Sequence, residues 1–233
     1  MAVPTLLSTQ ARDEQYAGLT YHIEGELVPV LQVEMRQMGI YFEHHVLLWK
    51  DPAVNVGVKT MKGAFKRMFA GMPIFMTEAT GPGRIAFSRD GAGHVFALHL
   101  TAGQSVDVRE HQFLAASGNV EYSFRRVQGI GNMLFSGTGF FIDTFTTAHQ
   151  EGALWLHGYG NVFEMELGQG EQMDIEPGGW IYKDPSVTME TKIQKLSSGF
   201  FASAGQLVWN RFTGPGRIAL QSMYMPMMPT PEQ

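Results

Sequence analysis

The sequence predicts an all-β protein built from three copies of one unit. The string TGPGRIA occurs at residues 80–86 and again at 213–219. KDPAV at 50–54 recurs as KDPSV at 183–187, separated by the same number of residues as the two copies of TGPGRIA. Two motifs that keep one register over this distance indicate duplication of a whole unit. Apolar residues alternate with a period of two rather than 3.6, which is typical of strands.

The middle copy is found at about half of the sequence separation between the two outer copies. GAGHVFALHLTAGQSVDV from Gly91 aligns with GYGNVFEMELGQGEQMDI from Gly158. AASGNV at 115–120 takes the place of the KDP segments, and TAHQEGAL stands where the other copies have GPGRIA. We therefore expect one domain over 1–233 in pseudo-threefold order, with repeats at approximately 20–86, 87–153 and 154–222, an N-terminal extension at 1–19 and a Met/Pro tail at 223–233.

The first copy is expected to end on a turn followed by a strand. Pro82 presets a negative φ and Gly83 tolerates a positive φ, as the two central positions of a type II turn require. In the strand that follows, Ile85 and Phe87 share one face. Because the middle copy lacks this motif, we interpret GPGR as a structural turn rather than as a phosphate-binding loop.

One segment of the first copy also has a helical pattern. KTMKGAFKRMFAGM at 59–72 places four apolar residues at helical spacing, but Gly63 and Gly71 weaken a helix there. VNVGV at 54–58, which precedes it, alternates as a strand with its three valines on one face. The 27 glycines of the chain, many beside short apolar runs, favour short strands and tight turns throughout.

Composition limits the classes of function. The chain has no cysteine, which excludes disulfides, thiolate nucleophiles and Cys-ligated zinc. Its formal net charge of −5 provides no overall basic field for nucleic acid, although a local basic stripe is still allowed. No apolar run approaches the roughly 20 residues of a membrane-spanning helix, and the N-terminus lacks the pattern of a secretory signal. These features predict a cytoplasmic protein.

The combined motifs resemble those of the Altered Inheritance of Mitochondria protein 24 family, from about Gly25 to Tyr224. The resemblance rests on GPGRIA, LHLTAGQSVDV, FLAASGNVEY and the glycine-rich turns before GFF or PIF. It implies the superfamily of the tryptophan RNA-binding attenuation protein (TRAP), whose β-sandwich units, related to the double-stranded β-helix, join edge to edge in rings. It further implies three TRAP-like repeats per chain, a homotrimer of nine units and, without a transit peptide, a bacterial source. It implies no catalytic residue or cofactor.

Five cations are the candidate contacts for an anion or a partner. Lys59, Arg125 and Lys192 occupy equivalent positions in the three copies, and Arg84 and Arg217 lie in the two GPGR turns. A repeated cation could meet successive phosphates around a ring, so an RNA-binding ring is one alternative function. The acidic net charge weighs against it, and cations also protect exposed strand edges.

A cupin-like metalloenzyme is the second alternative. Cupins place two histidines two residues apart on one strand, and here His99 is followed by Thr101 instead. His94 and His99, five residues apart, should project from opposite faces of a strand, and the adjacent pair His44 and His45 also diverges. The best remaining triplet on one face is His22, Glu24 and Glu26. A solvated strand face explains this triplet equally well, so we predict no metal site.

Other catalytic patterns are incomplete. Ser136 in LFSGTG lacks the first glycine of a nucleophile elbow, and Glu164 and Glu166 are expected on the outer face of a strand. The tail SMYMPMMPTPEQ is expected to pack against a neighbouring repeat or subunit, because flexible methionines fill irregular apolar surfaces. We therefore predict a non-catalytic, ring-forming assembly or scaffold protein that presents a surface to a protein partner or a membrane.

Overall fold

The computed structural model describes residues 3–8, 10–59, 76–127, 140–195 and 206–223, and in these ranges the protein is all-β, as expected. All strand pairs are antiparallel, and a single turn of 3-10 helix, η1 (His44–Val46), is the only helical element among them. The segment with a helical pattern, apart from Lys59, lies outside these ranges, as do Ser136 and the tail after Met223.

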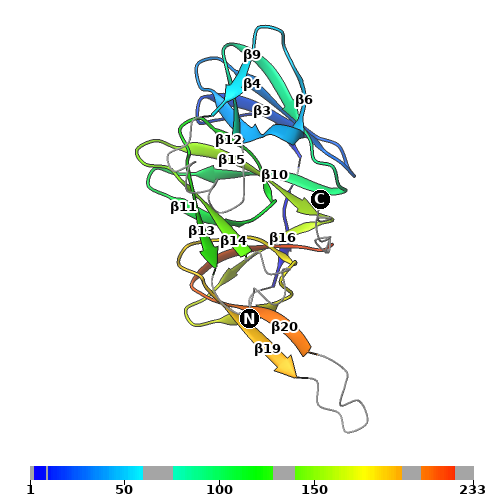
Figure 1. Ribbon diagram of the computed structural model, residues 1–233, viewed down its shortest axis with the longest axis vertical. Helices are drawn as coiled ribbons and strands as arrows, with labels where there is room; N and C mark the ends of the chain where they lie inside the picture. The colour runs from blue at the N-terminus through cyan, green and yellow to red at the C-terminus, as the bar shows by residue number, and fades with distance from the viewer. Residues whose placement is uncertain (1–2, 9, 60–75, 128–139, 196–205, 224–233) are drawn as a thin grey trace, which may run out of the picture.

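Four sheets follow one another along the long axis of the molecule (Figure 1). We number them first to fourth from the blue and cyan end to the yellow and orange end. The two end sheets are small. The first consists, in order, of β2 (Ala11–Tyr16), β3 (Leu19–Glu24), β4 (Val30–Met35), β9 (Gly83–Phe87) and β6 (Leu47–Lys50). The fourth consists of β17 (Gln172–Ile175), β20 (Gln206–Thr213) and β19 (Thr188–Lys195).

The two middle sheets combine strands from distant parts of the chain. The second sheet consists, in order, of β10 (Gly93–Leu100), β15 (Gly152–Tyr159), β12 (Phe113–Ser117), β5 (Ile40–Glu43), β8 (Met76–Thr80) and β7 (Asn55–Val58). The third consists of β1 (Thr5–Leu6), β16 (Val162–Leu167), β21 (Gly216–Gln221), β18 (Trp180–Lys183), β11 (Ser105–Arg109), β14 (Phe140–Thr146) and β13 (Glu121–Val127).

Three hydrophobic cores fill the spaces between successive sheets. The first core includes Phe42 and Phe87, the second Phe113 and Phe145, and the third Trp180 with Phe212. The middle sheets are therefore covered on both faces. In β15, Ala153 and Trp155 belong to the first core, whereas Leu154 and Leu156 belong to the second. Burial of apolar surface at roughly 25 cal/mol per Å² is the main force that holds the stack together.

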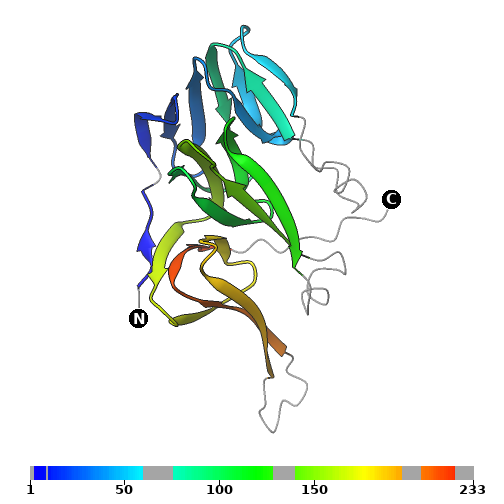
Figure 2. The ribbon, with the colours of Figure 1, turned by 90° about the vertical axis from the view of Figure 1, so that its left-hand side faces the viewer.

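The N-terminal segment connects distant layers. Thr5 and Leu6 of β1 pair with Glu164 and Phe163 of β16 in the third sheet. From there the chain runs along one side of the molecule to β2 at the edge of the first sheet (Figure 2). The Leu7 amide then donates to the Val162 carbonyl at 2.9 Å. This short strand covers the outer edge of the third sheet, which protects that edge from pairing with another chain.

The turn expected at GPGR is followed directly by a strand. β9 begins at Gly83 and β21 at Gly216, with positive φ angles of 141° and 135° that favour glycine. Ile85 and Phe87 are fully buried, as the alternation predicts. The three valines of 54–58 separate instead: Val54 is buried ahead of the strand, and the two in β7 are exposed. The expected repeat boundary at residue 153 lies inside β15.

Candidate functional site

The two repeated motifs contact each other in the same way at both ends of the chain. Asp51 of KDPAV accepts hydrogen bonds from the backbone N of Arg84 at 2.9 Å and from its Nε at 3.3 Å. Asp184 of KDPSV accepts from the backbone N and Nε of Arg217 at 2.9 and 3.2 Å. The motifs recur together because each aspartate anchors the start of the strand that follows the glycine turn.

The middle copy keeps this anchor with different residues. Ser117 Oγ accepts a hydrogen bond from the backbone N of Ala153 at 3.0 Å, at the start of β15. Gly152 precedes it, and a Cβ there would lie 2.5 Å from Val120 Cγ2. Gly83 has the same relation to Val54, at 2.8 Å. A glycine packed against the valine is therefore common to these turns, although the middle sequence TAHQEGAL shares almost nothing else with GPGRIA.

The other three candidate cations occupy the same register on successive sheets, and each has a partner within the chain. Lys59 Nζ lies 4.3 Å from the centre of the Tyr41 ring, and burial lowers its pKa. Arg125 Nη2 lies 2.8 Å from Asp107 Oδ2. Lys192 Nζ lies 2.8 Å from Glu190 Oε1. Like Arg84 and Arg217, these cations are engaged in intramolecular contacts, and their role in anion or partner binding stays a prediction.

A buried charge cluster lies at the seam between β11 and β18. Asp107 Oδ2 accepts from Lys183 Nζ and Arg125 Nη2, both at 2.8 Å, and Oδ1 accepts from Thr144 Oγ1 at 2.8 Å. The side chains of Lys183 and Asp107 are only 3% and 7% exposed. Burial by itself raises the pKa of the Asp107 carboxyl, but the hydrogen bonds from Lys183 and Arg125 outweigh it and hold the pKa below its usual value.

A second buried ion pair joins segments that the sequence does not relate. Arg89 Nη1 lies 2.7 Å from Glu43 Oε2, and the same guanidinium donates to the carbonyls of Phe113 and His111 at 3.1 and 2.8 Å. The pair connects the end of β5 with the chain after β9 and with the turn before β12. Sequence reasoning missed it because the partners are 46 residues apart and belong to no motif.

The histidines considered as metal ligands lie in separate surroundings. His99 Nε2 is 2.8 Å from Tyr21 Oη and its ring stacks on Tyr16, whereas His94 Nδ1 accepts from the Val162 amide at 3.4 Å. His22 contacts Glu24 at 3.1 Å on an exposed surface. Within the described part of the chain, no group of three or more His, Asp or Glu residues is arranged to hold a metal ion.

The two carboxylates of β16 differ from one another. Glu166 is exposed, as expected for an outer strand face. Glu164 is half-buried and accepts a short hydrogen bond from Tyr182 Oη, and Arg217 Nη1 lies 4.0 Å away. Burial raises the pKa of Glu164. The expected contact with solvent therefore applies to Glu166 alone, whereas Glu164 accepts the hydrogen bond of the buried Tyr182 from the interior of the same sheet.

The buried histidine His157 predicts a measurable pH dependence of stability. It is 1% exposed, and burial lowers its pKa to about 4. The charges of Arg89 and His94 act in the same direction, whereas the negative charge of Asp90 opposes them. In the unfolded chain the ordinary value is 6.5, so the unfolded state binds a proton that the folded state does not, and stability falls as pH decreases through this range. Between pH 7 and pH 5 the loss from this residue is about 2 kcal/mol.

Urea unfolding of His157→Leu at the two pH values checks this expectation. The variant should lose about 2 kcal/mol less than the parent on acidification. His149→Leu, at an exposed histidine, is the matched control and should keep the dependence of the parent. Equal pH dependence in all three proteins would contradict the assignment.

Two open hollows lie on the surface of the described residues. One of about 360 Å³ is lined by residues that include Met38, Lys59, Glu78 and Asn119, beside the contact of β5 with β12. Another of about 280 Å³ lies near Tyr16. Among the residues that the structure describes, no helix is long and apolar enough to cross a membrane.

Comparison with known proteins places the chain in one family. An uncharacterized protein of Streptococcus pyogenes serotype M6 is 26% identical over 211 residues, which cover 84% of this chain and 82% of that protein. A crystal structure of a Streptococcus pyogenes protein matches the fold with a TM-score of 0.68 at 21% identity, over 88% of this chain and 94% of that one. The family model described as "Mitochondrial biogenesis AIM24" matches residues 21–223. The chain therefore belongs to the AIM24 family, the one its motifs resemble.

Proposed function

We propose that the protein is a non-catalytic, ring-forming assembly or scaffold protein, made of three tandem TRAP-like repeats per chain and closed as a homotrimer. The repeats would be β4 to β9, β10 to β15 and β16 to β21. In each set, the first, sixth and third strands are neighbours in one sheet, and the second, fifth and fourth are neighbours in the next sheet. An identical strand order in three successive sets supports duplication of one unit.

The contacts between successive sets also repeat. β12 pairs with β5, and β18 pairs with β11, so in both cases the third strand of one set pairs with the second strand of the set before it. Both pairings are antiparallel. The cores between the sheets are continuous across these contacts, which is the behaviour expected of repeats that bury their faces against their neighbours.

The observation that carries the proposal is that one third strand and one second strand have no strand of a neighbouring set beside them. β6, the third strand of the first set, and β17, the second strand of the last set, both lie at the outer edges of their sheets. These are the two strands that would pair if another set preceded or followed. A head-to-tail contact between copies satisfies both edges, and such a contact forms a ring when its rotation closes.

The remaining surface favours presentation over catalysis. All five candidate cations already have intramolecular partners, which weakens the case for an RNA-binding ring. Exposed apolar side chains include Val58, 69% exposed on the edge strand β7, and Leu207, 40% exposed on β20 of the fourth sheet. Apolar residues on an outer surface are suited to contact a protein partner or a membrane.

Multi-angle light scattering of the purified full chain tests the assembly. We expect a single species of about 78 kDa, three times the 25.9 kDa of one chain, because closure leaves no edge free for further growth. A stable monomer over a wide concentration range would contradict the proposal. Retention of RNA that weakens steeply as salt is raised would instead favour the RNA-binding ring.

A further inference from the structure

The seam between β11 and β18 combines an apolar pair with a charged pair. Val108 lies opposite Tyr182, and Asp107 lies opposite Lys183, with 2.8 Å between Oδ2 and Nζ. Tyr182 is completely buried and the Lys183 side chain is 3% exposed. The third strand of one set thus contributes an aromatic residue and a lysine, and the second strand of the preceding set contributes an aliphatic residue and an aspartate.

The free edge strand β6 carries the same two residue types at the same positions. Both strands lie beside the sixth strand of their set in one register, opposite an alanine and an isoleucine: Trp49↔Ala86 and Lys50↔Ile85 on β6, Tyr182↔Ala219 and Lys183↔Ile218 on β18. Trp49 is 41% exposed and Leu48 beside it 54%, whereas Tyr182 is fully buried. An aromatic side chain that is buried at the inner seam is therefore uncovered at the chain's end.

The other free edge strand, β17, carries the complementary pair. Asp174 and Ile175 follow one another there as Asp107 and Val108 do in β11, and in both strands the aspartate is the third residue. Arg211 lies opposite Asp174 as Thr144 lies opposite Asp107, and its Nε and Nη2 are each 2.7 Å from the Asp174 carboxylate. At the inner seam a second cation, the lysine of the facing strand, completes the cluster.

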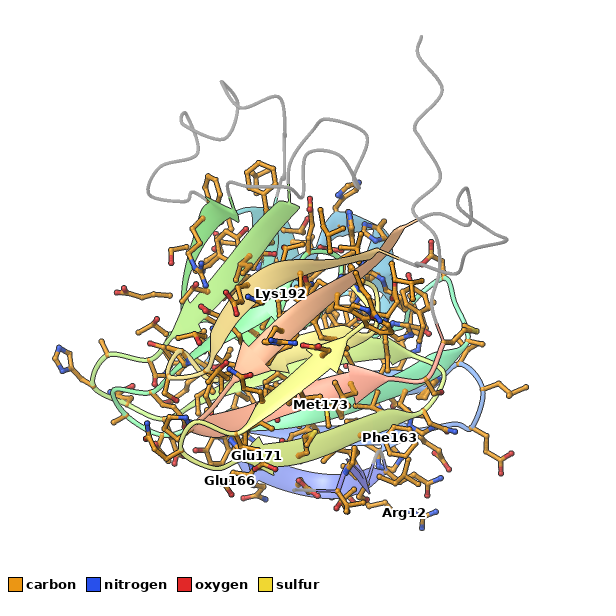
Figure 3. All side chains as sticks on the ribbon, turned by 90° about the horizontal axis from the view of Figure 1, so that it is seen from below. Arg12, Phe163, Glu166, Glu171, Met173 and Lys192 are labelled. Atoms are coloured by element: carbon orange, nitrogen blue, oxygen red, sulfur yellow. The ribbon has the colours of Figure 1, made fainter. Side chains whose placement is uncertain are left out.

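We propose that β17 of a second copy of this chain docks antiparallel against β6, with Asp174 opposite Lys50 and Ile175 opposite Trp49. The inference rests on the proposed assembly and adds its register and its determinants. β17 and β19 lie at the end of the molecule seen in Figure 3, where Met173 and Lys192 are labelled, and β6 belongs to the sheet at the opposite end (Figure 1). Docking would extend the fourth sheet of one copy into the first sheet of the next.

Disulfide trapping tests the register directly, because the chain contains no cysteine of its own. Directly opposite residues of antiparallel strands have Cα atoms about 4.5–5.5 Å apart, within the range that a disulfide bridges. Mild oxidation of the full-length Lys50→Cys/Asp174→Cys variant should therefore give covalent multimers on a non-reducing gel. Lys50→Cys/Gln172→Cys is the matched control: its diagonal separation of about 7–8 Å should reduce cross-linking at least fivefold.

Charge reversal provides a second readout that does not depend on cysteine. Lys50→Glu should weaken association at least tenfold, since it places a carboxylate opposite Asp174. Arg12→Glu, exposed on β2 at the opposite edge of the same sheet, should leave the mass unchanged. Circular dichroism identifies any variant that fails to fold, and in the unmodified protein the backbone amides of β6 and β17 should exchange slowly with deuterium.

The outcomes separate the inference from the proposed function. A species of about three chains that neither cross-links at 50 and 174 nor responds to Lys50→Glu overturns the register and leaves the assembly standing. Rapid amide exchange of β6 in such a species overturns it as well. A monomer under all conditions overturns both proposals.

Discussion

Replacement of Asp107 by alanine is expected to lower the free energy of unfolding by about 3–5 kcal/mol. The Lys183 side chain is 3% exposed, and its ammonium lies 2.8 Å from the Asp107 carboxylate. Without the carboxylate, the ammonium would stay buried beside the exposed Arg125, with no negative charge to offset its desolvation. An uncompensated buried charge costs far more than the pair contributes when it is intact.

Urea denaturation with paired controls separates the charge effect from loss of volume. Asp107→Leu combined with Lys183→Met removes both charges and should recover most of the stability, because well-packed apolar residues replace buried ion pairs with little loss. Asp90→Ala, whose side chain is 80% exposed, should change stability by no more than about 0.5 kcal/mol. An Asp107→Ala protein within about 1 kcal/mol of the parent would show that the seam does not depend on this pair.

The same pair adds a second pH dependence at lower pH. The pKa of Asp107 is lower in the folded protein than in the unfolded chain, so the stability it contributes is present above the unfolded value near 3.8. That stability is lost as pH falls through the folded value, below the range in which His157 acts. Acid unfolding of the parent should therefore be steeper below about pH 4 than that of the doubly apolar variant.

Gly93→Ala is expected to destabilise the protein by about 3 kcal/mol, at the upper end of the usual cost of overpacking. A Cβ at this position would overlap the carbonyl oxygen of Gly158 and lie 2.9 Å from the Cα of Tyr159. Both neighbours are backbone atoms of β15, which is buried between two cores, so neither can move aside. The glycine is required here by the close approach of β10 to β15 rather than by its φ angle.

Gly57→Ala is the matched control for this glycine. Gly57 also lies in a strand of the second sheet, but a Cβ there would meet nothing within 4 Å. We expect the control to leave the thermal midpoint unchanged or slightly raised, since alanine reduces the freedom of the unfolded chain. If differential scanning calorimetry gave both variants the midpoint of the parent, the result would contradict the close pairing of β10 with β15 at Gly93.

The sequence alone predicted the all-β class, the spacing of the motifs and the positions of the glycine turns. These features depend on a few neighbouring residues: a period of two marks a strand, and a positive φ requires glycine at Gly83 and Gly216. The family could also be identified at this level, because its motifs are short and continuous.

Only the tertiary structure decided which side chains meet. Glu43 and Arg89 form their ion pair across the end of β5, and Ser117 replaces an aspartate as the anchor of the middle turn. Residues 153–156 of β15 are all apolar because both faces of the strand are covered, which no local pattern reveals. Trp49 is exposed and its counterpart Tyr182 is buried because a second neighbouring strand lies beside β18 but not beside β6. Turns and periodicity are set by local conformational energy, whereas strand neighbours are set by the register of segments far apart in the chain.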